Sequence, residues 1–274
     1  KKKITKLKTK KIFIDSLNEG NFVNGIYEYE NTLDFFSNRL KTKYKILDNS
    51  INLESKKSLI KSTPIEYFGD INFKPFNFII NINTKKLNPS YFWKNLYLIN
   101  ELISTELLLN QNLYGKIKLY SDNVEKNKYF KKLDMNINFK ESEINFDDTK
   151  IYSAKLGELE VNDSILESVN GAAILSLKLK LKIKDKNLFF KTFLIPKENR
   201  KNIESLTFNI NFLLDSKKVI IRNILFEDKN KKLKNFDTVD KIILTNEQNK
   251  YDYLNPILFR KFIKEITIAY SQSG

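Results

Sequence analysis

The stretch from Ile174 to Lys184, I-L-S-L-K-L-K-L-K-I-K, decides the fold class of this chain. Leucine or isoleucine occupies every second position from Leu175 to Ile183, and serine or lysine occupies the positions between them. Successive side chains of a β-strand point to opposite faces of a sheet, so this alternation predicts a strand with one apolar face and one cationic, solvated face. At ~3.3 Å per residue the strand is about 33 Å long, which exceeds the usual strand length.

The same one-sided alternation recurs along the chain. It is clearest at residues 76–83, 133–140 and 207–214, and further strands are expected at 44–53, 65–73, 116–120, 144–151, 156–166 and 219–226. Repeated strands with a single apolar face are typical of an antiparallel sheet that is solvated on its other face. The Lys56-Lys57 region is expected to be a loop.

Helical spacing interrupts the strand pattern at three places. Asn88-Pro89, Asp185 and Pro256 each precede or begin a run with apolar residues three or four positions apart, and this predicts helices near 89–110, 185–204 and 256–270. Residues 21–40 also have a partly helical spacing. We therefore expect a mainly β fold with a few capping helices.

Composition excludes several classes of function. The chain of 274 residues has 41% hydrophobic and 13% aromatic residues, enough to bury a core, but it has no cysteine and no histidine. Disulfides, thiolate metal sites and histidine-based catalysis are therefore excluded. No apolar stretch approaches the ~20 residues of a membrane span, and no signal peptide follows the opening Lys1-Lys2-Lys3.

The formal net charge of +15 has two interpretations. A basic chain can bind nucleic acid or an anionic membrane. However, lysine, asparagine and isoleucine are abundant throughout while arginine is scarce, a bias typical of an AT-rich genome. Readers of nucleic-acid sequence rely on arginine for bidentate contacts with bases, so we expect no specific nucleic-acid partner.

Carboxylates are densest at Asp147-Asp148 and at Glu158, Glu160 and Asp163. Paired carboxylates can serve as acid and base or can bind a divalent cation. Here Glu158 and Glu160 alternate with apolar residues on the solvated face of a strand, and Asp147-Asp148 falls where a turn is expected. We predict neither a catalytic residue, nor a metal site, nor a cofactor, and we expect a protein that is not an enzyme.

Four short motifs in a fixed order resemble those of AsmA-like bacterial proteins. They are G-K-I-K-L at 115–119, I-N-F-D-D-T at 144–149, G-E-L-E-V-N-D-S at 157–164 and F-L-I-P-K-E-N-R at 193–200, with the long strand between the last two. The resemblance covers roughly residues 65–230. It divides the chain into residues 1–60, a segment of uncertain structure that could pack separately, and residues 61–274, an AsmA-like domain.

The resemblance implies a long curved sheet whose apolar face forms a groove for phospholipid acyl chains. It also implies a periplasmic protein that supports phospholipid transport and outer-membrane integrity. An N-terminal anchor in the inner membrane, which that family carries, is missing from this sequence. Two other hypotheses stay open: the apolar face simply packs into an ordinary core, or the lysine-rich face binds a polyanion or a membrane surface.

The candidate groove residues are the apolar members of four alternating strands. They are Phe76, Phe78, Ile80, Leu133, Met135, Ile137, Leu177, Leu179, Phe208 and Ile210.

Overall fold

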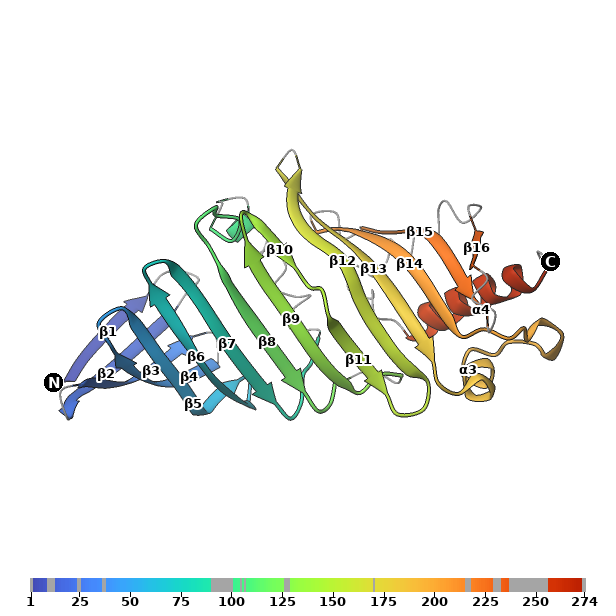
Figure 1. The fold of residues 1–274 in the computed structure, drawn as a ribbon. Helices are drawn as coiled ribbons and strands as arrows, with labels where there is room; N and C mark the ends of the chain where they lie inside the picture. The colour runs from blue at the N-terminus through green and yellow to red at the C-terminus, as the bar shows by residue number, and fades with distance from the viewer. Residues whose placement is uncertain are drawn as a thin grey trace.

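The computed structural model places all of its described strands in one long sheet (Figure 1). It describes residues 2–8, 13–23, 26–35, 38–89, 101–103, 105, 107–125, 129–169, 171–214, 218–228, 233–236 and 256–272. The first seven strands are β1 (Lys2–Lys8), β2 (Phe13–Val23), β3 (Ile26–Phe35), β4 (Asn38–Ile46), β5 (Ser50–Ile60), β6 (Thr63–Phe73) and β7 (Phe76–Thr84).

The remaining strands follow after residue 114. They are β8 (Gly115–Ser121), β9 (Lys132–Lys140), β10 (Glu143–Asn145), β11 (Thr149–Ser153), β12 (Gly157–Val169), β13 (Ala172–Ile183), β14 (Ser205–Leu213), β15 (Lys218–Glu227) and β16 (Leu233–Phe236).

The sixteen strands follow each other across the sheet in chain order. Every pair of neighbours is antiparallel except β7 and β8, which are parallel and joined by residues 85–114. The predicted antiparallel sheet is therefore confirmed with one exception. A parallel pair cannot be joined by a tight turn. This connection must therefore run from the C-terminal end of β7 back to the N-terminal end of β8, along the full length of the strands.

The N-terminal residues differ most from expectation. The helical spacing at 21–40 is a wrong prediction, because the described residues of this range, 21–23, 26–35 and 38–40, belong to β2, β3 and β4. The predicted strand at 44–53 is two strands separated by a turn at Leu47–Asn49. Lys56 and Lys57 lie within β5, where a bulge shifts the register between Ser55 and Ser58. Residues 1–60 thus contribute β1–β5 to the same sheet as the rest of the chain.

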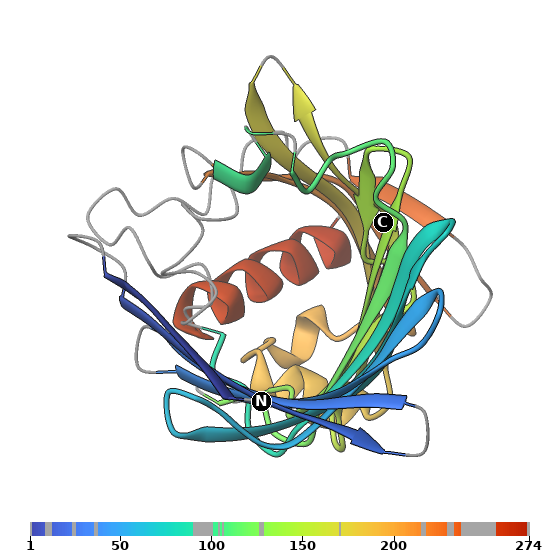
Figure 2. The same cartoon turned by 90° about the vertical axis from the view of Figure 1, so that its left-hand side faces the viewer.

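Two features bend the sheet. Strand twist accumulates over many strands, and bulges in β4–β5, β5–β6, β12–β13 and β14–β15 increase it locally. In addition, β10 and β11 together occupy one strand position, because both pair with β9 and with β12. Viewed along its long axis, the sheet is strongly curved and has a concave and a convex face (Figure 2).

The helices lie at the C-terminal end of the sheet, on its concave side (Figure 2). They are α3 (Lys186–Thr192), the 3-10 helix η1 (Lys197–Asn199) and α4 (Pro256–Gln272). As predicted, Asp185 caps α3, since its carboxylate accepts a hydrogen bond from the Leu188 amide at 2.9 Å. The predicted helix at 185–204 is shorter than expected. Of the one predicted at 89–110, residues 90–100 lie outside the described residues, and 101–103 are helical.

The main hydrophobic core, which we call the C-terminal cluster, lies between α3, α4 and strands β13–β15. Its strand members include Leu181, Ile183, Leu206, Phe208, Ile224 and Phe226, and its other members include Phe189, Phe193, Phe262 and Ile263. The Phe208 and Phe262 rings meet edge-on with their centroids 6.1 Å apart. A smaller Ile103 cluster contains Ile103, Ile144, Leu166, Ala173, Phe212 and Leu214. Both clusters pack on the concave face of the sheet.

Candidate functional site

The apolar face of the sheet is continuous from β6 to β15. Residues that are directly opposite in neighbouring strands share a face, so the strand register can be followed across the sheet. One row of such partners runs through Ile71, Phe78, Gly115, Phe139, Ile144, Leu166, Leu175, Phe212 and Val219. Because Ile144, Leu166 and Phe212 belong to the Ile103 cluster, the whole row lies on the concave face.

All ten candidate residues share this face. Ile80 is opposite Ile117, which is opposite Ile137, while Leu177 is opposite Ile210 and Leu179 is opposite Phe208. Phe76, Phe78 and Ile80 alternate within β7, and Leu133, Met135 and Ile137 alternate within β9. The alternation in the sequence therefore identified one common surface formed by four strands that are far apart in the chain.

Their burial varies along the sheet. Phe208 is 2% exposed in the C-terminal cluster, and Leu133 is also buried. These two side chains belong to packed regions of the structure, in contrast to the open surface expected for them. The others are half-buried, except for Phe76, which is 42% exposed. Of the half-buried ones, Leu179 and Ile210 pack against the C-terminal cluster and Ile137 packs against the Ile103 cluster. Neither hydrophobic cluster contains a described residue of β1–β8.

The concave face of β6–β9 carries no charged side chain, and all four strands are fully described. Its members are Thr63, Ile65, Tyr67, Gly69, Ile71 and Phe73 of β6, Phe76, Phe78, Ile80, Ile82 and Thr84 of β7, Gly115, Ile117, Leu119 and Ser121 of β8, and Leu133, Met135, Ile137 and Phe139 of β9. At Gly115 a side chain would not fit, because its Cβ would lie 2.5 Å from the Phe78 ring. The glycine thus lets an aromatic ring lie flat across the sheet.

An aromatic ladder extends this face into the N-terminal strands. The ring of Phe22 lies 4.8 Å from that of Tyr27, and the Tyr29 and Tyr44 rings stack with centroids 5.1 Å apart. Tyr27 is opposite Ile46, Ile46 is opposite Ile51, and Ile51 is opposite Ile71, which lies on the concave face of β6. Phe22 is 63% exposed. Sequence reasoning missed these residues, although the alternation Tyr27-Glu28-Tyr29-Glu30 is a strand signal.

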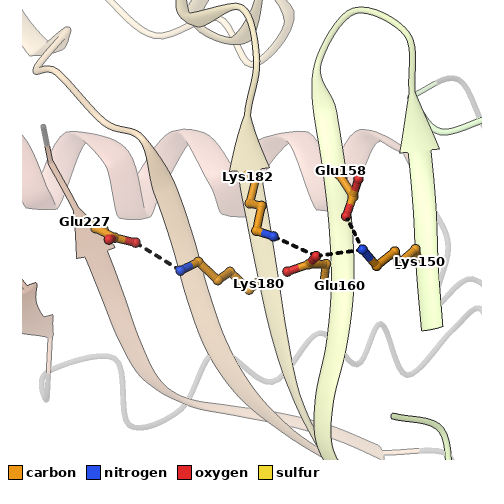
Figure 3. Close-up of polar contacts among 6 residues, drawn as sticks. All are labelled: Lys150, Glu158, Glu160, Lys180, Lys182 and Glu227. Atoms are coloured by element: carbon orange, nitrogen blue, oxygen red, sulfur yellow. Dashed lines mark hydrogen bonds and ion pairs between the residues drawn. The ribbon is translucent and has the colours of Figure 1, made fainter. Parts of the chain in front are cut away.

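On the convex face, charged side chains of β11, β12, β13 and β15 form ion pairs (Figure 3). Lys182 Nζ lies 2.6 Å from Glu160 Oε1, and Lys150 Nζ lies 3.3 Å from the same oxygen and 3.2 Å from Glu158 Oε1. Lys180 pairs with Glu227 at 3.1 Å. Lys178 pairs with Asp163 at 3.3 Å. Lys178, Lys180 and Lys182 of β13 therefore have carboxylate partners on neighbouring strands, which reduces the charge that they could offer to a polyanion.

Glu160 is the most strongly perturbed of these carboxylates. Burial alone would raise its pKa, but hydrogen bonds that involve Lys182, Glu158 and Lys150 outweigh this effect and lower the pKa to about 2. The same contacts raise the pKa of Lys150. The arrangement stabilises the charged forms of both partners, and it links β11, β12 and β13 across the convex face.

Asp147, which the sequence also marked as a candidate, has structural partners. Asp147 Oδ1 accepts hydrogen bonds from the Ser164 amide at 2.8 Å and from its hydroxyl at 2.6 Å. The Ser164 hydroxyl in turn accepts a hydrogen bond from the Phe146 amide at 2.7 Å. These contacts hold the β10–β11 turn against the bulge in β12.

Within the described ranges, no group of three or more acidic side chains is arranged to hold a metal ion.

No helix among the described residues is long and apolar enough to span a membrane. Comparisons of the chain with protein-family models, with curated proteins and with solved structures find no match. The resemblance to AsmA-like proteins thus stays a prediction made from the sequence.

Proposed function

We propose that the concave face of β3–β9 binds the acyl chains of phospholipids and that the protein carries or bridges lipids without catalysing a reaction. The observation that carries the proposal is a charge-free apolar face, continuous over many strands, that the two hydrophobic clusters cover only from β9 towards the C-terminal end in the described structure. Large exposed apolar surfaces are rare on soluble proteins, and they mark sites for lipid, membrane or protein partners.

Transfer energetics favour an acyl chain as the occupant. Each methylene group exposed to water costs about 0.8 kcal/mol, so the two chains of a phospholipid face a barrier of roughly 20 kcal/mol to leaving a bilayer unaided. An apolar face lowers this barrier, because the chains stay shielded while the polar head group remains in water. No reactive side chain is needed for this role.

The face also suits a ligand without fixed polar features. Its polar members in β6–β9 are confined to three hydroxyl-bearing residue types, and several already have partners, such as Thr84, whose hydroxyl donates to the Pro64 carbonyl at 3.1 Å. Tyr67 and Thr42 hydroxyls bond to each other at 2.5 Å. Contacts with a bound chain would therefore be apolar, and we expect low selectivity among acyl chains.

From the AsmA-like resemblance of the sequence we further propose that the protein acts in the periplasm, beside the inner membrane, in support of the outer membrane. We include this location in the proposal. Its test is separate from that of lipid binding, because it depends on the gene and on fractionation of cells rather than on the purified protein.

Two adjacent isoleucines provide a matched test of the lipid proposal. Ile80 lies on the concave face, whereas Ile79 lies on the convex face and is 50% exposed. A photo-crosslinking amino acid at residue 80 should capture phospholipid in cells, and the same amino acid at residue 79 should not. Native mass spectrometry of the unmodified protein should detect bound lipid.

Three outcomes would contradict the proposal. They are equal capture at residues 79 and 80, capture of no lipid at either residue, and crosslinking at residue 80 to a second copy of the chain. The last outcome would mean that two apolar faces pack together as a conventional sandwich.

A further inference from the structure

The two long edges of the sheet, where strands end and turns connect them, differ in charge. One edge is the lower edge in Figure 1, formed by the turns after β5, β7, β8, β11 and β13. Between β5 and β13 its exposed lysines are Lys61, Lys85, Lys86, Lys131, Lys132, Lys155 and Lys184. We call these residues the basic edge. They come from separate turns, but strand register brings them into one line that spans roughly 30 Å at ~4.8 Å per strand.

The opposite edge is an internal control for composition. Over the same strands its charged residues at turns and strand ends are Asp48, Lys74, Lys140, Glu141 and Glu143, so acidic residues outnumber lysines by three to two. On the basic edge the described acidic residues are Asp122, Glu125 and Asp185, against seven lysines. A genome-wide bias toward lysine acts on both edges equally, so it cannot explain a difference between them. The excess of lysine is thus a property of one edge of this fold.

Four lysines of the basic edge are also available for binding. Lys178, Lys180 and Lys182 on the convex face pair with carboxylates on neighbouring strands. By contrast, Lys85, Lys86, Lys131 and Lys132 pair with no carboxylate in the part of the chain that the structure describes. An unpaired, exposed ammonium group keeps its full attraction for an anionic surface.

An exposed apolar side chain accompanies this charge. The connection from β13 to β14 leaves and rejoins the sheet at the same edge, and it carries Leu194 between the buried Phe193 and Ile195. Leu194 is 55% exposed and has a φ of 54°, which is uncommon for a residue other than glycine. Lys191 and Lys197 near it are exposed. A projecting leucine among lysines is typical of contacts with a membrane interface.

We propose that the basic edge docks on the surface of an anionic phospholipid bilayer, with Leu194 entering the interface. The strand ends would then contact the membrane, with the strands pointing away from its surface. The concave face would open beside the lipid head groups. Nucleic acid is a poorer fit, since residues 40–199 contain no arginine and the phosphate backbone offers no place for leucine. The proposal holds whether or not acyl chains bind the concave face.

Co-sedimentation with vesicles tests the docking. We expect the protein to bind vesicles of phosphatidylcholine that contain phosphatidylglycerol, and not vesicles of phosphatidylcholine alone. Raising the salt concentration from about 0.1 M to about 0.5 M should weaken the binding by screening. Replacing Lys85, Lys86, Lys131 and Lys132 with glutamate should weaken it at least tenfold, because each lysine near an anionic surface contributes about a fivefold change in affinity.

Matched variants separate docking from general charge effects. Lys74→Glu with Lys140→Glu reverses charge on the opposite edge and should leave vesicle binding nearly unchanged. Leu194→Asn should weaken binding to vesicles several-fold but not binding to a short DNA duplex. Circular dichroism and thermal melting should show that each variant is folded.

The proposal is wrong if the quadruple glutamate variant binds as the wild type does, or if the opposite-edge variant loses as much affinity. Tight binding to the DNA duplex, with no effect of Leu194→Asn on vesicles, would instead indicate a site for polyanions in general. Lipid capture at residue 80 is unaffected by these outcomes, so the two proposals fail separately.

Discussion

Phe208 and Phe76 occupy the same face of the same sheet, yet one is 2% and the other 42% exposed. The difference arises from what lies over them. Around Phe208, helices α3 and α4 complete the C-terminal cluster, and Phe262 packs against the ring. Around Phe76, the neighbouring rings are those of the sheet itself, such as Phe78 at 6.4 Å. Identical alternation therefore produces a packed core at one end and a solvent-accessible apolar face at the other.

This comparison separates two properties that an alternating strand does not distinguish. Alternation determines which side chains share a face, because it follows from backbone geometry. Whether that face is covered depends on elements that are distant in sequence. The C-terminal end has its own core and resembles a conventional helix-on-sheet layer, whereas β3–β7 contain Ile65 as their one buried large apolar residue in the described ranges. That imbalance is why a ligand is proposed at the N-terminal end.

The largest expected effect comes from a pair of phenylalanine substitutions. Phe208→Ala should lower the free energy of unfolding by about 3–5 kcal/mol, because it leaves a cavity in the C-terminal cluster. Phe76→Ala in the lipid-free protein should lower it by less than about 1.5 kcal/mol, since much of the ring is already in water. Urea denaturation measures both. Equal losses would mean that the two ends are covered alike.

Amide hydrogen exchange should show which strands bound lipid protects. At a lipid concentration of about 100 times Kd, binding stabilises the native protein by about 2.7 kcal/mol. We expect exchange to slow most for amides of β6, β7 and β8, and least for those of β13 and β14, which the helices already cover. Mass spectrometry of peptides with and without lipid makes the measurement. Greater slowing at β13 would place the ligand elsewhere.

Glu160→Gln tests the charge network on the convex face. Removing the shared partner of Lys150 and Lys182 should cost roughly 1 kcal/mol at neutral pH. The pKa of Glu160 is about 2 in the folded protein and 4.5 ordinarily, so its contribution is complete above pH 4.5 and is lost as the pH falls towards 2. Melting temperatures of the two proteins should therefore converge over that window. A constant difference at all pH values would contradict the assigned role.

The smallest effect is expected at Lys178. Its pair with Asp163 is well exposed to solvent on both sides, so Lys178→Gln should change the free energy of unfolding by less than about 0.5 kcal/mol. Asp163→Asn is the matched change in the partner. Thermal melting at neutral pH checks both. A loss above 1 kcal/mol would show that the convex face contributes more than the network at Glu160 suggests.

Period-2 patterns in the sequence predicted most of the strands and the shared face of all ten candidate residues. They failed at 21–40, where Phe22, Leu33 and Leu40 happen to match helical spacing, although Tyr27-Glu28-Tyr29-Glu30 alternates clearly. The turn at Asp48-Asn49 was also missed. Such short-range signals were present in the sequence and were outweighed by a competing pattern.

Other features could not have been predicted from local patterns. The parallel pairing of β7 with β8 depends on where the chain goes between residues 85 and 114. Similarly, the helical spacing after Pro256 predicts α4 but not its position against Phe208. Long-range placement of this kind reflects packing in three dimensions, which no spacing of residues within one strand encodes. Burial at Phe208 and exposure at Phe76 were therefore indistinguishable in advance.

The chain-order arrangement of the strands has a consequence for how such a sheet can vary. Because strands pair with their neighbours in sequence, the sheet extends along one axis, in the manner of a repeat protein. In the observed strand order the first and last strands do not have to pair with each other. Insertion or loss of one hairpin would change the length of the apolar face by two strand spacings, about 10 Å, and leave the other pairings intact. The distance that such a face covers is thus an adjustable quantity, set by the number of hairpins rather than by the identity of any residue.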